Sequence, residues 1–527
     1  MPLIYQLLLG LVLTLLIPLW PSNTLPFLHL LRSLTTTPMM DGISLAQKAQ
    51  LHEVADLMLE IYKTLAAMRY IDAQAINPGP HNVSDLLYGL DPAVIYLYSI
   101  LPYIDKDFAT NTAFFNGGIF ADFRKSDDVE QGRDPFYGSP SEENFEDEDG
   151  PYMRPWVTPL SLLGNHGSAI VYDTRQHHIW IIDQEGWSST DPALEGVEDG
   201  EPDSINRNYF AHIANRPAGD VLRDMVRWYR ELKELPGGTE YSDLCWDHWD
   251  MDLKSLFEKN GWPDNFDGDA FLVDQAREFC ALRAKGDAEN PLGEVKKFTD
   301  WKNGKADRAK KAQEALDAAQ NLNETWKARF ELWNAERSVL RNTEELKKAQ
   351  QEADRLCPNG VCQRPEDLPL WELVAVQREL GWKQNDLSYH RDWAEKSKES
   401  DPEEAKTYRA AFYLAEKEVA TYEKAYEAAK ADADRLCPGR SPKSVAGIKD
   451  LDQDDTMRDV QRRTELDVIL TRELDALREW AAQIPPEANE AKGMADNQIE
   501  GLDKSVEDNQ AALKKAQDWI AEEKEKE

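Results

Sequence analysis

Three short stretches between residues 112 and 191 specify the core of the amino-terminal half. They read FFNGGIF at 114–120, SAIVYD at 168–173 and HIWIID at 178–183. Adjacent Asn and Gly tolerate positive φ, so the first stretch predicts a tight turn between strands. A short polar turn separates the other two, which predicts a β-hairpin. Both faces of HIWIID are apolar, so we expect a central strand that is covered on both sides.

Helices are predicted on both sides of these strands. Apolar residues at alternating spacings of three and four predict one packed helix: Leu51, Val54, Met58, Ile61, Leu65 and Met68. A second helical segment is expected near 84–98, with an interruption at Asp91-Pro92. A third is expected over 219–235, where Pro236-Gly237-Gly238 stops it.

An acidic insert interrupts the strand region. Residues 125–150 are polar and hold six carboxylates between 142 and 149, which predicts a mobile surface loop because like charges repel. With its helices and strands, the region over residues 43–280 is predicted to form an α+β head. Residues near its end are expected to close the core: Trp246, Trp249, Leu253, Phe257 and Trp262.

Several short motifs resemble a known family. They are Leu101-Pro102, Asn116-Gly117-Gly118, Gly164, Gly167 and Asp173. In this order they are similar to the SUKH superfamily, which includes yeast cell-wall assembly regulators and many bacterial immunity proteins. The resemblance covers about residues 84–190 and implies a mixed sheet with packed helices, protein binding and no catalysis. The chain departs from the family in the insert at 125–150, an extra amino-terminal helix and a helical carboxy-terminal half.

From about residue 285 the chain becomes rich in Ala, Glu, Lys and Gln, and it contains a repeat. ADRLCP at 353–358 recurs at 433–438, so equivalent positions differ by 80 in number. Extended backwards, the repeat covers 322–358 and 402–438. Its second copy carries an apolar heptad stripe: Tyr408, Phe412, Ala415, Val419, Tyr422, Tyr426, Ala429, Ala433 and Leu436.

The first copy of the repeat carries the same stripe at the equivalent positions, with Asn342 as its polar member. A lone Asn at such a position fixes register at some cost in stability. Further helices are expected over 456–483 and 488–523, on either side of Pro485-Pro486. Residues 285–527 therefore predict antiparallel helical hairpins or a coiled-coil arm, which serves as a spacer, a partner surface or a site of self-association.

Composition limits the classes of partner. A length of 527 residues favours two or more domains, and 16 Trp with 41% hydrophobic residues allow a sizeable core. A net charge of −36 argues against nucleic acid, because a polyanion would be repelled. Basic protein partners fit this charge, although solubility alone also explains it.

Cysteine usage leans toward a reducing compartment. Five cysteines are too few for a disulfide framework, and their number is odd. Cys357 and Cys362 would close a small loop if oxidised, or would supply two metal ligands. No second Cys or His pair accompanies them, so no metal or cofactor is predicted.

The amino terminus predicts a membrane anchor or a signal peptide at residues 1–22, followed by a linker at 23–42. Residues 2–20 carry no charge and would rise about 28 Å as a helix, close to the hydrocarbon thickness. No basic residue precedes Arg32 and no small-residue cleavage site follows, which favours an anchor over a signal peptide. The positive charges of Arg32 and Lys48 after the anchor then favour a body in the cytoplasm. The sequons at Asn82 and Asn323 suit the opposite topology, in the secretory pathway or outside the cell.

No catalytic set emerges from the sequence. Cys245 and His248 would share one face of a helix, but Trp246 and Trp249 flank them, so a buried aromatic cluster is favoured over a Cys-His site. His177 and His178 are expected to point to opposite faces of a strand, which is poor geometry for a metal. His166 is expected in a turn, and DNFDGD at 264–269 lacks the EF-hand spacing.

These observations favour a non-enzymatic, membrane-tethered protein-interaction module, in which a head is followed by a helical arm. One alternative is a secreted or luminal hydrolase that uses a Trp-rich cleft near Cys245 and His248. The other is a structural protein whose arm, residues 285–527, self-associates.

Overall fold

The structure is a computed structural model. It describes residues 42–83, 89–109, 111, 113–136, 152–164, 167–183, 186–201, 206, 208–237, 251–398, 401–445, 447–448 and 455–526. Contacts divide the chain into two compact units, Met1–Leu244 and Cys245–Glu527, which are described separately as the head and the arm. Helices dominate the described residues, and the small antiparallel sheets lie in the head. An α+β head followed by a helical region fits this arrangement.

The boundary between the units lies earlier than residue 280, the predicted end of the head. Phe257 belongs to the arm because its ring stacks on Phe271 at 4.2 Å and also meets Trp262 and Phe266. The expected packing of Trp246 and Trp249 lies outside the described residues.

The head contains four α-helices and eight short strands among its described residues. The helices are α3 (Leu45–Ala67), α4 (Pro92–Ile100), α5 (Ser126–Arg133) and α6 (Ala218–Arg230). The strands are β1 (Ile76–Asn77), β2 (Tyr103–Ile104), β3 (Ile119–Phe120), β4 (Val157–Pro159), β5 (Ser161–Leu162), β6 (Ser168–Asp173), β7 (His178–Asp183) and β8 (Arg216–Pro217). Three-residue 3₁₀ turns are η2 (Ala73–Ala75), η3 (Lys106–Phe108) and η5 (Pro192–Leu194).

The predicted hairpin is the centre of the largest sheet of the described head. The strand order is β4-β6-β7-β8, and all the pairs are antiparallel. Ile170 pairs with Ile181 and Val171 with Trp180, and every residue of β6 is buried. The four middle residues of β7 are buried as well, which confirms a central strand covered on both sides.

The glycines of the sequence motifs meet in space. Asn116 and Gly117 have positive φ, 43° and 72°, as the predicted tight turn requires. A Cβ on Gly118 would lie 2.5 Å from the carbonyl oxygen of Ser168, and one on Gly164 or Gly167 would collide with the Gly117 backbone. The turn and the start of the β-hairpin therefore touch backbone to backbone, which only glycine permits.

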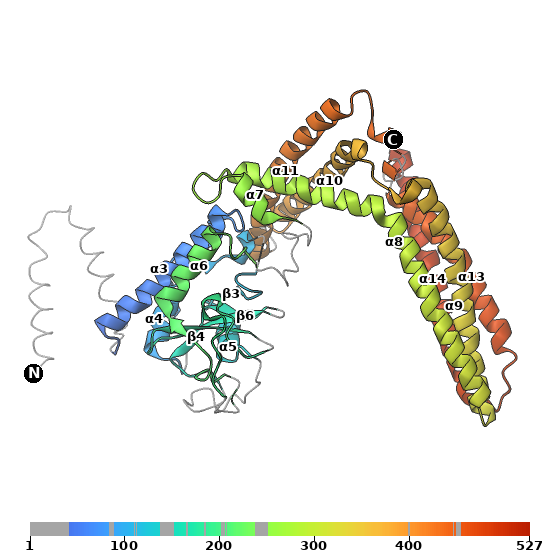
Figure 1. The fold of residues 1–527 in the computed structure, drawn as a ribbon, viewed down its shortest axis with the longest axis horizontal. Coiled ribbons are helices and arrows are strands. Elements are labelled where there is room, and N and C mark those ends of the chain that lie inside the picture. Colours follow the sequence, from blue (N-terminus) through green and yellow to red (C-terminus); the bar gives the residue numbers. More distant parts are fainter. Residues whose placement is uncertain are drawn as a thin grey trace, which may run out of the picture. The chain divides into compact units, whose positions relative to one another are not determined.

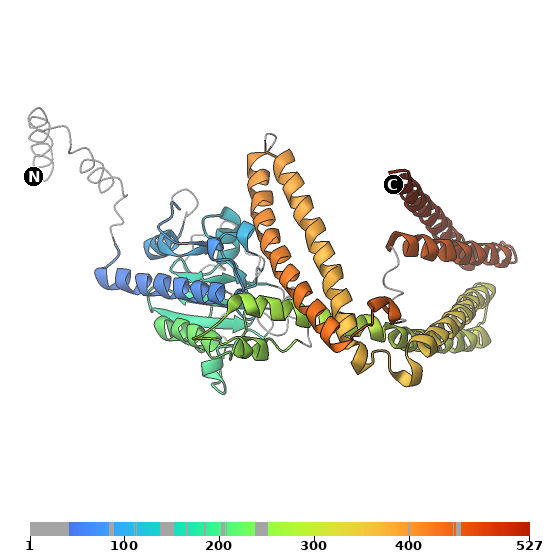
Figure 2. The same ribbon diagram turned by 90° about the horizontal axis from the view of Figure 1, so that it is seen from above.

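Helices α3 and α6 lie side by side on the head (Figures 1 and 2). The predicted stripe from Leu51 to Leu65 is buried along α3, as expected for a packed helix. The segment expected near 84–98 is helical only from Pro92, because Asp91 caps α4 by accepting from the Ala93 amide and Pro92 occupies the first turn. Residues 84–88 lie outside the described residues.

The predicted acidic insert begins as part of the core. Residues 126–133 form helix α5 instead of a mobile loop, and Val129 and Arg133 are buried. The helix is held because Asp128 accepts the Asp122 amide at 2.6 Å and Gly132 lies against Phe123 and Pro159. Residues 137–151, with the six carboxylates, lie outside the described residues.

The arm is helical throughout its described residues. Its helices are α7 (Leu253–Lys259), α8 (Gly268–Ala318), α9 (Leu322–Leu356), α10 (Leu368–Lys396), α11 (Pro402–Leu436), α13 (Asp455–Ala481) and α14 (Asn489–Lys526). Three-residue turns are η6 (Pro358–Gly360), η7 (Pro365–Asp367) and η8 (Pro442–Ser444). Helix α8 runs across residues 280–285, where the sequence suggested a change of domain, and contains Pro291.

The helices pair as three antiparallel hairpins, as predicted. Hairpin 1 is residues 292–318 of α8 with α9, hairpin 2 is α10 with α11, and hairpin 3 is α13 with α14 (Figure 1). Helices α9 and α11 have the same length and occupy equivalent positions of the repeat, and both end at a Cys-Pro pair. Asn342 is buried in α9, as its place in the apolar stripe predicts.

Two apolar clusters connect the hairpins. The first half of α8 presents Ala276, Cys280, Ala284 and Ala288 to the base of hairpin 2. Hairpin 3 packs on hairpin 1, where Phe330 of α9 meets Leu477, Ala488 and Ala491. In the described part of the chain no helix is both long and apolar enough to cross a membrane. The predicted anchor at residues 2–20 and the linker up to residue 41 lie outside that part.

Candidate protein-interaction site

The head contains a chain of polar side chains that resembles a catalytic relay. His177 lies in the turn before β7 with φ of 57°, and its Nε2 is 3.1 Å from Glu53 Oε2 of α3. Its Nδ1 is 3.0 Å from the Tyr172 hydroxyl of β6. Glu53 also accepts from Arg223 of α6 at 2.7 Å.

The two ends of this chain differ in exposure. Tyr172 is fully buried, and burial raises the pKa of its hydroxyl well above the ordinary range. The side chain of Glu53 is 38% exposed, and the hydrogen bond from Arg223 is the main cause that lowers its pKa, so this carboxylate stays ionised and paired. The group therefore ties α3, the hairpin turn and α6 together.

The histidines and acidic residues noted in the sequence have structural partners. His178 Nδ1 lies 2.6 Å from Asn215 Oδ1. The two histidines were predicted on opposite faces of a strand, but only His178 is in β7, and His177 lies in the turn before it with other partners. Asp267 caps α8 by accepting from the Ala270 amide at 3.0 Å. Cys245, His248 and His166 lie outside the described residues. Within the residues that the structure describes, no group of three His, Cys, Asp or Glu side chains is arranged to hold a metal ion.

The four cysteines in the described part of the arm are oxidised or buried. Cys357 and Cys362 form a disulfide that closes the small loop after α9, which decides between the two predicted roles of this pair. Cys437, at the matching end of α11, is buried and free, and its Sγ donates to the Glu366 carbonyl oxygen at 3.3 Å. Burial raises the pKa of the Cys280 thiol, the opposite of what a nucleophilic cysteine requires.

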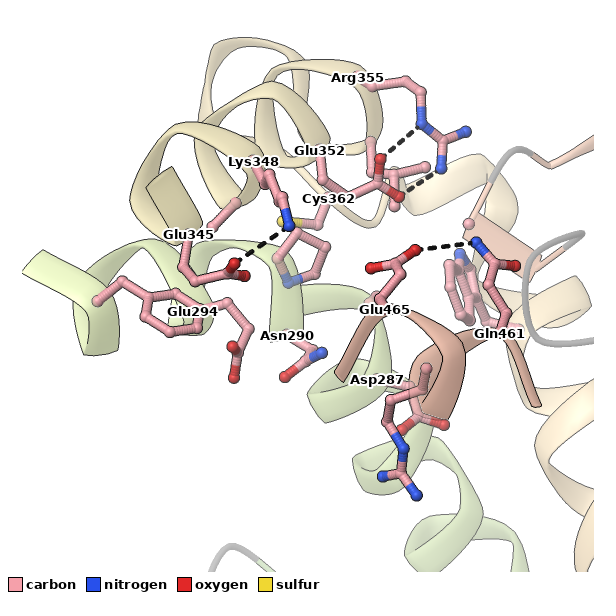
Figure 3. Close-up of a pocket in the computed structure, with 18 residues that line it drawn as sticks. Asp287, Asn290, Glu294, Glu345, Lys348, Glu352, Arg355, Cys362, Gln461 and Glu465 are labelled. Atoms are coloured by element: carbon pink, nitrogen blue, oxygen red, sulfur yellow. Dashed lines mark hydrogen bonds and ion pairs between the residues drawn. The ribbon is translucent and has the colours of Figure 1, made fainter. Parts of the chain in front are cut away.

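A groove of about 730 Å³ opens in the arm where α8 contains Pro291. Figure 3 shows its labelled residues from α8, α9 and α13, with Gln461 and Glu465 opposite the α9 side chains. Most of its charges are paired inside the protein. Glu345 accepts from Lys348 at 3.1 Å, and Glu352 accepts from Arg355 at 2.9 Å.

The described lining of the groove contains no Ser, Thr, His or free Cys side chain. Its one sulfur atom, on Cys362, is in the disulfide. Trp371 lines it as a buried side chain whose Nε1 meets no acceptor among the described atoms. Glu465 accepts a long hydrogen bond from Gln461, 3.4 Å. The described lining of the groove is therefore mainly polar side chains that are paired within the protein.

A second surface lies on hairpin 2 and is aromatic. Trp382, Tyr389 and Trp393 of α10 are 67%, 50% and 37% exposed. Spacings of seven and four residues place all three on one face of the helix. These three residues are called the aromatic patch below.

Tyr408 of α11 supports the aromatic patch near the tip of hairpin 2. Its ring stacks on Trp393 with centroids 5.8 Å apart, and it meets Tyr389 at 6.3 Å. A hydrogen bond with Tyr389 is the main cause that raises the pKa of Tyr408. Lys396 lies over the Trp393 ring at 5.3 Å. The rings therefore form a connected set that is open on its outer side.

The aromatic patch was not predicted, although the repeat placed Tyr408 in the seam between helices. The available signal was three aromatic residues at helical spacing in the mainly polar second half of α10. Comparison of the chain with protein-family models, curated proteins and solved structures found no match. The resemblance of residues 84–190 to the SUKH superfamily therefore stays a prediction.

Proposed function

We propose that this chain is a non-enzymatic protein-interaction protein, tethered to a membrane by residues 2–20, with a head and a helical arm that both bind protein. The observation that carries the proposal is the aromatic patch on hairpin 2. Three large rings stand exposed on one face of a helix whose other side is already paired with α11. A helix that served only as a spacer would not need an exposed apolar face in water.

The size and chemistry of the patch fit a protein interface. Taking about 200 Å² for a whole aromatic side chain, the exposed fractions amount to roughly 300 Å². Tyr389 and Trp393 are in ring contact, with centroids 6.1 Å apart, and Trp382 extends the same face of α10. Exposed apolar patches of a few hundred Å² often mark interaction sites on soluble proteins. Trp and Tyr are also enriched where binding energy is concentrated in interfaces.

The head supports the same proposal through its charge. Its resemblance to the SUKH superfamily implies protein binding without catalysis. Glu195, Glu198 and Glu201 are exposed in the described part of the head, and the whole chain carries a net charge of −36. Complementary charge steers association, so the partner of the head is proposed to be basic.

The test is a comparison of three tagged full-length chains in affinity purification with quantitative mass spectrometry. They are the unmodified chain, the triple variant Trp382→Ala/Tyr389→Ala/Trp393→Ala, and Trp301→Ala as the matched control. Trp301 is 52% exposed on α8 and, like Trp382, precedes a lysine. We expect proteins that the unmodified chain and the control retain and the triple variant loses. Identical recovery from all three chains would contradict the proposal for the patch.

The membrane orientation is tested at Asn82, which is exposed in the head. With the body in the cytoplasm, treatment of the full chain with a glycosidase leaves its mobility on a gel unchanged. A shift that Asn82→Gln abolishes would place the head outside the cytosol. The disulfide between Cys357 and Cys362 suits that opposite topology, so the measurement also decides how the disulfide is maintained.

A further inference from the structure

We propose that the aromatic patch binds the same patch on a second copy of this chain, so that two copies of hairpin 2 pair face to face. This pairing rests on the proposed function of the patch and names its partner. Such an isologous contact places Trp382, Tyr389 and Trp393 of one chain against the same three residues of the other.

Hairpin 3 of the same chain shows how an aromatic residue near a hairpin tip is packed. In hairpin 3, Trp480 precedes the tip within Arg478-Glu479-Trp480-Ala481. Its ring lies 5.3 Å from Phe330 and 5.5 Å from Trp333, both in α9 of hairpin 1. Trp480 is therefore packed against another helical hairpin, and aromatic rings lie on both sides of this contact.

Hairpin 2 also has a Trp near its tip, but no ring of another described hairpin packs on it. Trp393 precedes the tip within Arg391-Asp392-Trp393-Ala394, the same Arg-x-Trp-Ala pattern. Its surroundings are rings of its own hairpin, Tyr389 and Tyr408, and its outer side is open. The aromatic face of α9 that receives Trp480 is already occupied within the chain, whereas the patch of a second copy is open.

Charge permits the contact between two copies. The whole chain is strongly acidic, at −36, and most of its surfaces would repel each other. The outer part of α10 is balanced: Arg378, Lys383, Arg391 and Lys396 stand beside Glu379, Asp386, Asp392 and Glu395. Arg378, Glu379 and Lys383 are already in ion pairs within the chain. Two such helices therefore approach without net repulsion.

The area of the rings predicts a weak contact. The patch exposes roughly 300 Å² on each copy, so the rings alone contribute about 600 Å² when both copies are counted. The stems of the flanking Lys and Arg side chains add apolar area at the rim. The rings alone give about half of the roughly 1,200 Å² at which stable interfaces begin, so the dimer is predicted to be weak and reversible.

The experiment is sedimentation equilibrium of the full chain in a density-matched detergent, because residues 2–20 are apolar. The unmodified chain and Trp301→Ala are expected to reach the mass of two chains of 60.1 kDa with rising concentration. The triple variant is expected to remain at one chain, with unchanged circular dichroism because Ala favours helix. Trp382→Glu alone is expected to weaken the dimer at least tenfold, because it places two carboxylates in the contact.

A single-chain mass for the unmodified chain at every concentration overturns the inference, and so does a triple variant that still forms the dimer. The proposed function is judged separately. If the unmodified chain stays monomeric while the triple variant loses a different protein in affinity purification, the dimer is wrong and the interaction function stands. If the triple variant loses nothing in either experiment, both are wrong.

Discussion

Hairpins 1 and 2 each contain one copy of the repeat and differ in what covers them. In α9 the outer positions are Trp326, Phe330 and Trp333, and hairpin 3 packs on them. The equivalent positions in α11 are Lys406, Ala410 and Tyr413, and the described helices on which α11 packs extensively are α10 and α8. The exposed rings of hairpin 2 lie instead on α10.

The inner and outer faces of these helices have separate roles. The inner seam is shared: Ala335, Ala349 and Ala353 of α9 are buried, as are Ala415, Ala429 and Ala433 of α11. Small residues at these positions allow two helices to approach closely, and they set the hairpin. The outer face determines which other hairpin packs on the helix, and the two copies of the repeat differ on this face.

The largest expected effect is at Phe330, which is buried between hairpins 1 and 3. Phe330→Ala gives α9 the residue that α11 has at the equivalent position. We expect a loss of about 3–5 kcal/mol in the free energy of unfolding, from lost burial and the cavity left behind. Urea unfolding gives the magnitude, and hydrogen exchange should rise in α13 and α14. A loss no larger than that of Trp301→Ala would show that hairpin 3 is not held by this cluster.

The second effect concerns the ends of the repeated helices. Cys357 is bonded to Cys362 in the loop that follows α9, whereas Cys437 is free. Closing so short a loop stabilises the folded state by roughly 2 kcal/mol in the chain-entropy model. Reduction should therefore speed proteolysis over residues 357–367 and leave residues 437–445 unchanged. Equal acceleration at both places would mean that the disulfide has no separate role in hairpin 1.

A smaller effect is expected at Asn342, which is buried where α11 has Tyr422. Asn342→Leu should raise the free energy of unfolding by about 1 kcal/mol, because an apolar residue replaces a polar one in the seam. Thermal unfolding of the full chain gives the sign. Lys347→Leu, at an exposed position of the same helix, is the control and should change little. Destabilisation at Asn342 would indicate that its side chain makes a contact that the seam requires.

The smallest effect is expected at Trp301, whose exposed ring meets Phe298 and Lys297 of its own helix α8. Trp301→Ala should change stability by no more than about 0.5 kcal/mol, as for most exposed substitutions. Urea unfolding and sedimentation together check this. A loss of the dimer in this variant would move the interaction surface from hairpin 2 to hairpin 1.

Much of each element was predictable from local pattern. The Asn116-Gly117 turn follows from the positive φ that these residues tolerate, and the β-hairpin from the alternation on either side of its turn. The boundaries of α9 and α11 follow from the repeat and from the prolines that end both helices. Helix α5 was missed because its buried Asp128 and Arg133 look like surface residues in the sequence.

Local sequence was enough to specify where most helices and strands form and which face of each is apolar, because these depend on neighbours a few residues apart. Which of the apolar faces are covered is a property of the tertiary structure. Phe330 meets Leu477 from a distant part of the chain, and no period in the sequence specifies that contact. The rings of α10 have a similar pattern and no such partner in the described chain. Burial depends on the approach of distant elements, so the exposed aromatic face of α10 became visible only in the folded arm.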